Sequence, residues 1–321
     1  MIVVVCLNPA LDITHQVTAV HWGGVNRPRA VHARPGGKGV NVARTLHALG
    51  ADVLLMGLAG GVIGAGIEAA LGRLGVPAAL SPIAAETRRT FTVVDGGGTG
   101  DGVGAVTAFN EAGPEVTARE FKEFRGQYDK ALAGASAVVL SGSLPSGLPA
   151  GTYATLIEMA SAAGVPVVLD THGEALLSGA AALPAIVKPN LEELGGLTGR
   201  RLSTTDGPDL AAVTAAAEEL RAAGAQAVVV SLGSTGLLAA TGDGRWRARP
   251  AAVAGNATGA GDAVVAGLTH GLVIGRSWDE RLRHAAALGA ATVAAPVAGE
   301  FTDADYAEAL VAVAVHRDEV G

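Results

Sequence analysis

The sequence predicts an α/β protein built around one mainly parallel sheet, and three observations carry this prediction. Short apolar runs, each bounded by Gly, Asp or Pro, recur along the chain. Segments long enough for a helix separate most of these runs. About half of the 321 residues are apolar (49%) but only 3% are aromatic. The core must therefore consist largely of Ala, Val and Leu, which suits helices packed closely on a parallel sheet.

The apolar runs predict strands, and the segments between them predict helices. We expect strands over Ile2 to Leu7, Val53 to Leu58, Val138 to Leu140, Val165 to Leu169, Ala185 to Val187 and Ala227 to Val230. We expect helices over Val40 to Leu49, Thr117 to Leu132, Thr152 to Ala163, Leu210 to Ala223, Asp262 to Gly275, Asp279 to Ala295 and Asp303 to His316. Such sheets bind ligands beyond the carboxyl ends of their strands, so we expect the chemistry there.

Two stretches depart from this rhythm. Residues 13–34 and 88–109 alternate polar and apolar side chains, the second around a turn-rich middle from Gly96 to Gly104. Alternation indicates antiparallel strands outside the main sheet. We expect one domain spanning residues 1–321, with these two stretches forming a small discontinuous lid over the carboxyl edge. The strand edges and the single apolar face of this lid need cover, so the sequence also predicts a homodimer that forms through the lid strands.

Charge and composition exclude several classes of partner and site. The net charge is -7 and the basic residues are scattered, whereas a nucleic-acid surface needs clustered cations. The longest uncharged stretch, Ala131 to Ile157, is broken by Pro145 and Pro149, so no membrane span is predicted. The eight His residues form no zinc-ligand pattern. Cys6, the only cysteine, should be a buried strand residue, and the absence of a signal-peptide pattern predicts a cytoplasmic protein.

The strongest local motif is Asn256-Ala257-Thr258-Gly259-Ala260-Gly261-Asp262-Ala263, which precedes a helical pattern. Small residues let consecutive backbone N–H groups approach an anion, and the helix N-terminus adds partial positive charge. An aspartate at a helix start is also a favoured N-cap. This motif alone does not distinguish a helix cap from a catalytic residue, and the functional interpretation of Asp262 depends on the motifs that accompany it.

A second glycine turn, from Pro35 to Asn41, also opens a predicted helix. Its glycines would permit close approach of a sugar, and Lys38 and Asn41 can donate to hydroxyl or phosphate oxygens. Because Lys38 is followed by Gly39 and not by Ser or Thr, a Walker nucleotide site is not expected. The alternative is an ordinary turn with a solvated lysine.

More polar turns follow other predicted strands. Asp12 ends the turn after the first strand, where a carboxylate can accept bonds from two sugar hydroxyls, although an Asn-Pro turn capped by Asp would look the same. Three others run over Ser141 to Pro145, Lys188 to Glu193 and Ser231 to Gly236. Packing alone does not explain so many such turns at one sheet edge. A nicotinamide site at Gly57 to Gly66 is excluded because the Gly-x-Gly-x-x-Gly spacing is missing.

The ordered motifs LNPALD, PGGKGVN, SGSLPSG, KPNLEEL, SLGSTG and NATGAGD span nearly the whole chain. In this set the chain resembles the ribokinase-like superfamily, in its pfkB branch of phosphosugar kinases. The resemblance implies a three-layer α/β/α fold with a β-strand lid, ATP and Mg²⁺ as cofactors, and a phosphosugar as acceptor. It favours fructose 1-phosphate, with tagatose 6-phosphate and fructose 6-phosphate close behind. The alternatives are a kinase of unphosphorylated sugars or nucleosides and a non-catalytic sugar sensor.

The resemblance also implies a role for each residue at a matching position. Asp262 would be the catalytic base, and Thr258, Gly259, Ala260 and Gly261 would form the anion hole for the phosphoryl group. Nucleotide contacts would come from Lys188, Asn190, Ser231, Gly233 and Gly236, with Asn190 and Glu193 organising Mg²⁺ through water. Sugar contacts would come from Asp12, Gly37, Lys38, Asn41, Arg88 and Ser141. Arg89 lies beside Arg88, and either arginine could meet a substrate phosphate.

Overall fold

The computed structural model describes residues 1–96, 105–295 and 299–318. A large sheet contains β1 (Ile2–Cys6), β4 (Val53–Ala59), β5 (Ala78–Pro82), β8 (Ala137–Ser141), β9 (Val167–Asp170), β10 (Ile186–Val187), β13 (Val228–Ser231), β14 (Leu237–Thr241), β15 (Gly244–Arg249) and β16 (Ala314–Asp318). The strand order is β16-β15-β14-β13-β10-β9-β8-β1-β4-β5. The strands from β13 to β5 are parallel, and β14, β15 and β16 extend the sheet in antiparallel fashion.

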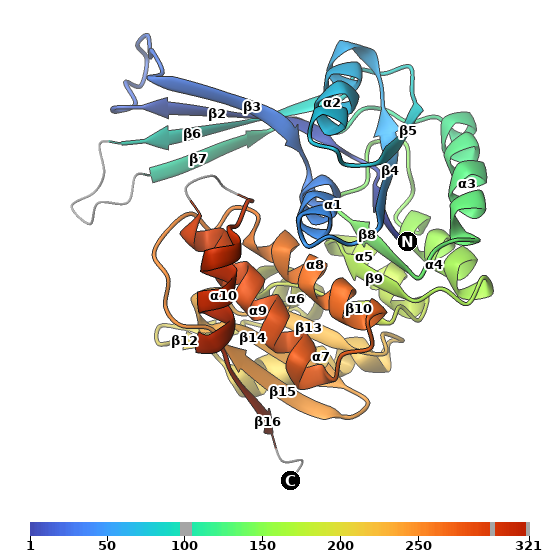
Figure 1. Ribbon diagram of the computed structural model, residues 1–321, viewed down its shortest axis with the longest axis vertical. Helices are drawn as coiled ribbons and strands as arrows, with labels where there is room; N and C mark the ends of the chain where they lie inside the picture. The colour runs from blue at the N-terminus through green and yellow to red at the C-terminus, as the bar shows by residue number, and fades with distance from the viewer. Residues whose placement is uncertain (97–104, 296–298, 319–321) are drawn as a thin grey trace.

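Helices cover both faces of this sheet (Figure 1). One layer contains α1 (Lys38–Ala48), α2 (Gly61–Arg73), α8 (Ala260–Val273) and α9 (Trp278–Ala294), with α10 (Asp303–Ala312) packed on α9. The other layer contains α3 (Ala118–Leu132), α4 (Thr152–Ala162), α5 (Gly173–Ala181), α6 (Leu191–Thr198) and α7 (Leu210–Ala222). Along β1, Val3 and Val5 face the second layer and Val4 and Cys6 the first, so the strand is buried on both faces. The predicted α/β fold with a mainly parallel sheet is confirmed.

All six predicted strands form, and each predicted helix has a counterpart in the structure. The prediction for Asp303 to His316 was wrong at its end, because the helix stops at Ala312. Residues 314–318 instead pair with β15 as the edge strand β16, with Val315 opposite Ala248. An alanine- and valine-rich segment fits either structure, and the free edge of β15 decides between them. A short hairpin of β11 (Ser203–Thr204) and β12 (Gly207–Pro208) and a 3₁₀ turn at Gly233–Thr235 complete the described elements.

A second, four-stranded sheet stands away from the large one (Figure 1). It contains β2 (Ala10–Val17), β3 (Ala30–Gly36), β6 (Arg88–Asp95) and β7 (Ala105–Asn110) in the order β3-β2-β6-β7. We call it the small sheet. The predicted bounds were too short, because β2 begins at Ala10 and pairs there with Gly36. The central pair β2 and β6 is parallel, which corrects the prediction of purely antiparallel strands. The predicted turn from Gly96 to Gly104 lies outside the described residues after position 96.

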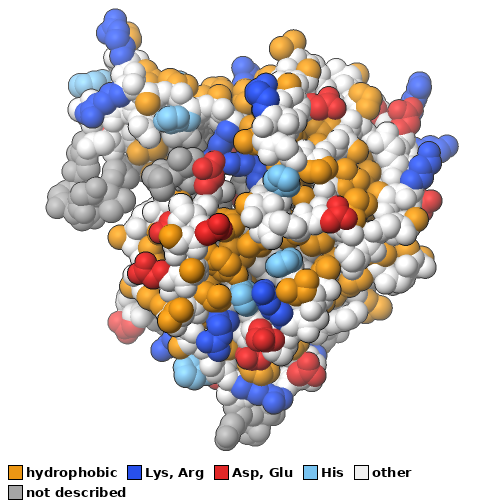
Figure 2. Space-filling view, in the orientation of Figure 1, with side chains coloured by type: hydrophobic (Ala, Val, Ile, Leu, Met, Phe, Trp, Pro, Cys, Tyr) orange, Lys and Arg blue, Asp and Glu red, His pale blue; other side chains and the backbone are white. Residues whose placement is uncertain are grey.

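The small sheet joins the body at the carboxyl edge of the large sheet, because β2 follows β1 and β3 leads directly into α1. Acidic and basic side chains lie next to one another in this region of the surface (Figure 2). None of the helices in the described ranges is long and apolar enough to cross a bilayer.

Candidate active site

The carboxyl ends of the parallel strands bring functional side chains together at one edge. Asp170 ends β9, Lys188 directly follows β10, and Ser231 ends β13. Helices α1 and α8 pack against each other, and their N-termini meet at the same edge. Lys188, Ser231 and the starts of α1 and α8 are positions that the sequence indicated, and the structure places them at the same edge as Asp170.

Asp262 lies in the first turn of α8 and is only 8% exposed. The Asn41 side chain, from the first turn of α1, donates a hydrogen bond of 2.8 Å from Nδ2 to Asp262 Oδ2. Asn41 is itself buried. The amide therefore fixes the orientation of the carboxylate and leaves Oδ1 without a hydrogen-bond partner among the described contacts.

The environment of Asp262 favours its protonated form. Burial, followed by the nearby negative charge of Asp170, raises the pKa of the Asp262 carboxyl from 3.8 to about 7. The Asn41 hydrogen bond and the ammonium groups of Lys38 and Lys188 act in the opposite direction but are outweighed. A carboxylate with a pKa near neutrality can take a proton from a hydroxyl group and release it again.

The turn before Asp262 has the backbone geometry of an anion site. Gly259 is left-handed, with φ of 86°, and a Cβ there would lie 2.6 Å from Gly299 Cα, so the position requires glycine. Helix α8 begins at Ala260, and its first N–H groups have no acceptors within the helix. A Cβ at Gly261 would lie 3.9 Å from Lys188 Nζ, so this turn faces a buried ammonium. Thr258 is exposed and donates its N–H to Asn256 Oδ1.

A cluster of two carboxylates and two lysines lies beside this turn. Lys188 Nζ is 3.1 Å from Asp170 Oδ1, and both side chains are buried. Lys38 Nζ is 3.5 Å from the same oxygen and 3.1 Å from Glu193 Oε1. Burial opposes the charge of Asp170, but Lys188 and then Lys38 outweigh it and lower the pKa of its carboxyl. The cluster therefore holds charged groups of both signs at the edge of the anion site.

Asp170 was missing from the residues that the sequence predicted. It directly follows the predicted strand Val165 to Leu169, just as the turn with Asp12 follows the first strand, and this placement was the available signal. Ser141 was predicted to contact the sugar, and this was wrong. Its side chain is fully buried and donates from Oγ to Asp170 Oδ2 at 3.1 Å. Ser141 therefore helps to fix the orientation of the Asp170 carboxylate from within the core.

Asn190 and Glu193 form the capping box that starts α6. Asn190 Oδ1 accepts from the Glu193 N–H, and Glu193 Oε2 accepts from the Asn190 N–H, at 2.8 and 2.9 Å. Both atoms are thus occupied in the helix cap, and Glu193 Oε1 remains to face Lys38. Ser231 lies beside Asn190 in a parallel bridge. This bridge joins the segment of Glu193 to the turn of Gly233 and Gly236, which have φ of 63° and 99°.

The donor set suits a hard divalent cation only in part. Within the described ranges no three His, Cys, Asp or Glu side chains are arranged to hold a metal. Glu193 Oε1 and Asp170 Oδ1 approach the same ammonium, so they can approach the same cation. Mg²⁺ usually takes one or two carboxylates and fills its other positions with water and phosphate oxygens. These two carboxylates fit that pattern, and Asn190 fits it only through water because its oxygen caps α6.

Asp12 lies on β2, where the small sheet joins the body. Its Oδ1 accepts a hydrogen bond from Thr90 on β6. A Cβ at Gly36 would lie 1.8 Å from Asp12 Oδ2, and one at Gly37 would lie 3.3 Å from Cys6 Sγ. The two glycines were expected to make room for a sugar. The structure shows instead that protein atoms fill the space next to both α-carbons.

Arg88 and Arg89 point to opposite faces of the small sheet. Arg88 is half-buried and donates through Nε and Nη2 to the Asn8 carbonyl and through Nη1 to the Glu111 carbonyl. Arg89 is exposed and pairs with the Glu111 carboxylate. Arg88 is therefore the arginine that faces the body. Its two terminal nitrogens each carry a second N–H for a ligand.

Two further arginines lie near the site and were not predicted. Arg34, on β3, is the register partner of Asp12, and a Cβ at Gly299 would lie 3.6 Å from its Nη2 and 3.9 Å from Asn41 Oδ1. Arg44, on α1, pairs with Glu300 at 2.8 Å. This ion pair ties α1 to the chain between α9 and α10. No sequence motif distinguishes these arginines, because what places them at the site is strand register and helix packing.

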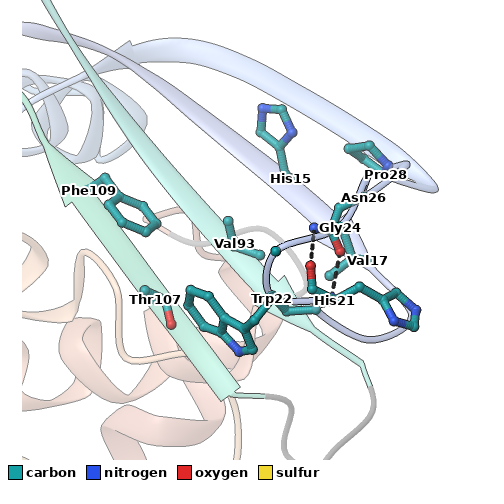
Figure 3. Close-up of a pocket in the computed structure, with 12 residues that line it drawn as sticks. His15, Val17, His21, Trp22, Gly24, Asn26, Pro28, Val93, Thr107 and Phe109 are labelled. Carbon is teal, nitrogen blue, oxygen red and sulfur yellow. Dashed lines mark hydrogen bonds between the residues drawn. The ribbon is translucent and has the colours of Figure 1, made fainter.

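The small sheet has a polar and an apolar face. Asp12, Arg34 and Thr90 are register partners, so their side chains share the face toward the body. The other face is hollowed by about 380 Å³ and lined by His15, Val17, Trp22, Val93, Thr107 and Phe109 (Figure 3). Trp22 is 82% exposed and Phe109 is 54% exposed. A large apolar surface of this kind indicates an interaction site.

Comparisons with known proteins agree on one family. The family model described as pfkB family carbohydrate kinase matches residues 5–304. Phosphofructokinase-2 from Escherichia coli is 30% identical, with 97% of this chain and 98% of that chain covered and a TM-score of 0.87. It has been solved with fructose 6-phosphate and in a tetrameric inhibited form. A protein described as a possible 1-phosphofructokinase from Thermotoga maritima is 26% identical over 99% and 100% of the two chains, with a TM-score of 0.86.

Proposed function

Because this chain belongs to the pfkB family of carbohydrate kinases and is an ATP-dependent sugar kinase, we propose that its acceptor is a ketohexose phosphate. Our first choice is fructose 1-phosphate, which would become fructose 1,6-bisphosphate. Tagatose 6-phosphate and fructose 6-phosphate are the next candidates. The observation that carries the proposal is the buried Asp262 carboxylate, held by Asn41 at the start of α8 beside the Lys188 ammonium.

In the proposed reaction the acceptor hydroxyl lies between Asp262 and the γ-phosphate of ATP. Its oxygen forms the new bond to phosphorus, the bond to the β-phosphate oxygen breaks, and ADP leaves. Asp262 takes the hydroxyl proton. The N–H groups of Gly259, Gly261 and Asp262 and the Lys188 ammonium stabilise negative charge on the transferred group. The Ala260 N–H already donates to the Ala257 carbonyl at 3.1 Å. Mg²⁺ on the Asp170 and Glu193 side would neutralise phosphate charge when bound.

The remaining residues have proposed binding roles. The turn from Ser231 to Gly236 would line the nucleotide, next to Lys188 and Asn190. Asp12 and Asn41 would contact sugar hydroxyls, and the small sheet would close over them as a lid that excludes water. Gly37 would contribute through its backbone, because its α-carbon packs against Cys6.

The experiment that tests the acceptor is a panel of fructose 1-phosphate, fructose 6-phosphate, tagatose 6-phosphate and the free sugars, compared by kcat/KM. We expect fructose 1-phosphate to give the highest value. A free sugar that matches or exceeds every phosphosugar would overturn the proposal and favour a kinase of unphosphorylated sugars.

The pH dependence of kcat/KM should follow the Asp262 carboxyl. Its pKa is raised from 3.8 to about 7, so the carboxyl is protonated and inactive as a base below that pH. We expect kcat/KM to rise with pH up to about 7 and then to level off. Asn41→Ala removes a hydrogen bond that lowers this pKa, so it should move the rise to higher pH. A profile that does not move in this variant would assign the rise to the substrate phosphate.

Arg88→Ala tests the contact to the acceptor phosphate. Arginine binds phosphate oxygens in a fork, and a hydrogen bond to a charged group contributes about 1.5–3 kcal/mol. We expect roughly a ten- to hundredfold loss of kcat/KM with a phosphosugar and a much smaller loss with the free sugar. Equal losses on both substrates would mean that Arg88 only anchors the small sheet through the Asn8 and Glu111 carbonyls.

We also propose that two copies pair through the apolar faces of their small sheets. Trp22, Val31 and Phe109 are each more than half exposed there. Light scattering at micromolar concentration should give the mass of a dimer. Phe109→Asp should shift this to a monomer, whereas Val311→Asp, at an 89% exposed position on α10, should not. A wild-type monomer would contradict the proposal.

A further inference from the structure

Lys38 occupies an unusual electrostatic position. It is the first residue of α1, and the N-terminus of a helix carries partial positive charge that disfavours a cation. Its ammonium is nevertheless well compensated, because Glu193 Oε1 lies at 3.1 Å and Asp170 Oδ1 at 3.5 Å. These two carboxylates come from the end of β9 and the start of α6. Lys38 is thus turned toward the carboxylates, and not toward the phosphate of an acceptor under the small sheet.

The two lysines of the cluster are not equivalent. The Lys188 side chain is 4% exposed and lies against the buried Asp170, so it is a fixed part of the core. The Lys38 side chain is 36% exposed and has a flexible four-carbon stem, so its ammonium can leave. Glu193 keeps Oε2 on the backbone of Asn190 and turns Oε1 to Lys38. Among the ion pairs of the described ranges, those of Lys38 join Asp170 to Glu193.

We propose that Lys38 is the resident counter-ion of the Asp170–Glu193 carboxylate pair and is displaced from it by a divalent cation. Without a metal, two close carboxylates would repel each other, and the ammonium prevents this. When the cation arrives, Lys38 leaves the pair and lies next to the transferred phosphoryl group. The inference rests on the proposed kinase site. It assigns Lys38 to the phosphoryl-transfer side, in place of the contact to the acceptor that its motif indicated.

The test measures metal binding in the absence of nucleotide and sugar. Mn²⁺, a paramagnetic substitute for Mg²⁺, is titrated into wild type, Lys38→Met and Lys38→Arg, and free Mn²⁺ is followed by electron paramagnetic resonance. Lys38→Met keeps the length of the stem and removes the competing charge, so we expect it to bind Mn²⁺ about tenfold more tightly. Lys38→Arg keeps the charge and should bind like wild type. The matched control Lys122→Met, on the exposed side of α3, should also bind like wild type.

Two results would overturn the proposal. One is an unchanged Mn²⁺ affinity in Lys38→Met. The other is a higher Mn²⁺ affinity that persists in the Lys38→Met/Glu193→Gln double variant, because the cation would then not depend on the Glu193 carboxylate. If Lys38→Met does not fold, wild type alone decides. Mg²⁺ should then accelerate acetylation of Lys38, measured by peptide mass spectrometry, because the ammonium is released from the pair, and an unchanged rate would contradict displacement.

An activity measurement separates this inference from the choice of acceptor. Lys38→Met should lower kcat by a similar factor with phosphorylated and unphosphorylated sugars, since the transferred group is the same. A loss confined to phosphosugars would return Lys38 to the acceptor phosphate and overturn the proposal. The sugar panel tests only the acceptor, and the Mn²⁺ titration tests only the displacement of Lys38. Either proposal can therefore be contradicted while the other stands, and the two failures are distinguishable.

Discussion

Asp262→Asn should lower turnover by about a hundredfold or more while leaving the affinity for ATP nearly unchanged. Asparagine keeps the shape of the side chain and can still pair with Asn41, but it cannot accept the proton of the hydroxyl. The backbone N–H groups of α8 and the Lys188 ammonium remain in place to bind phosphate. Steady-state kinetics and isothermal titration with ATP provide the two measurements.

Stability separates loss of a base from loss of the fold. The folded-state pKa of Asp262 is raised to about 7 from 3.8, so folding disfavours its ionised form. This cost grows as pH rises from about 4 to about 7 and is constant above it. Asp262→Asn removes the cost and should unfold at a higher temperature than wild type at pH 8. The exposed control Asp303→Asn should leave activity unchanged and lower stability by less than about 1 kcal/mol, because Asp303 lies in the first turn of α10. Turnover within about tenfold of wild type would refute the assignment.

Asp170→Asn should destabilise the fold by about 3–5 kcal/mol, the usual cost of removing one partner of a buried ion pair. The substitution leaves the Lys188 ammonium, which is 4% exposed, without the carboxylate 3.1 Å away. It also weakens the hydrogen bond that the Ser141 hydroxyl donates to the side chain at position 170. Urea unfolding monitored by circular dichroism at pH 7 gives the free energy.

Two variants show whether this cost comes from the unpaired ammonium. Lys188→Met in the Asp170→Asn background removes the stranded charge and should recover part of the stability. Glu123→Gln removes a partner of the exposed Arg119–Glu123 pair and should cost less than about 1 kcal/mol. A loss for Asp170→Asn no larger than that of Glu123→Gln would mean that the buried pair contributes little.

The order of strands and helices could largely be predicted from the sequence. Apolar runs such as Ile2 to Leu7 form strands because they are buried on both faces, and the glycine turns place helix starts at Lys38 and Ala260. These signals are local, since hydrophobic period and turn chemistry act within a few residues. Where two structures fit the same local pattern, as at residues 314–318, the prediction failed.

The candidate site was predictable as a set of turns but not as a set of contacts. Glycine and polar residue types after each strand identified the edge, and Asp262 among them. Asn41 meets Asp262 across 221 positions of the chain, and Lys38 meets Glu193 across 155. Such pairs depend on strand order and on which side chain is buried, which no local pattern encodes. Only the tertiary structure could therefore decide that Asp170 completes the cluster, that Ser141 lies behind it, and that Lys38 turns toward the carboxylates.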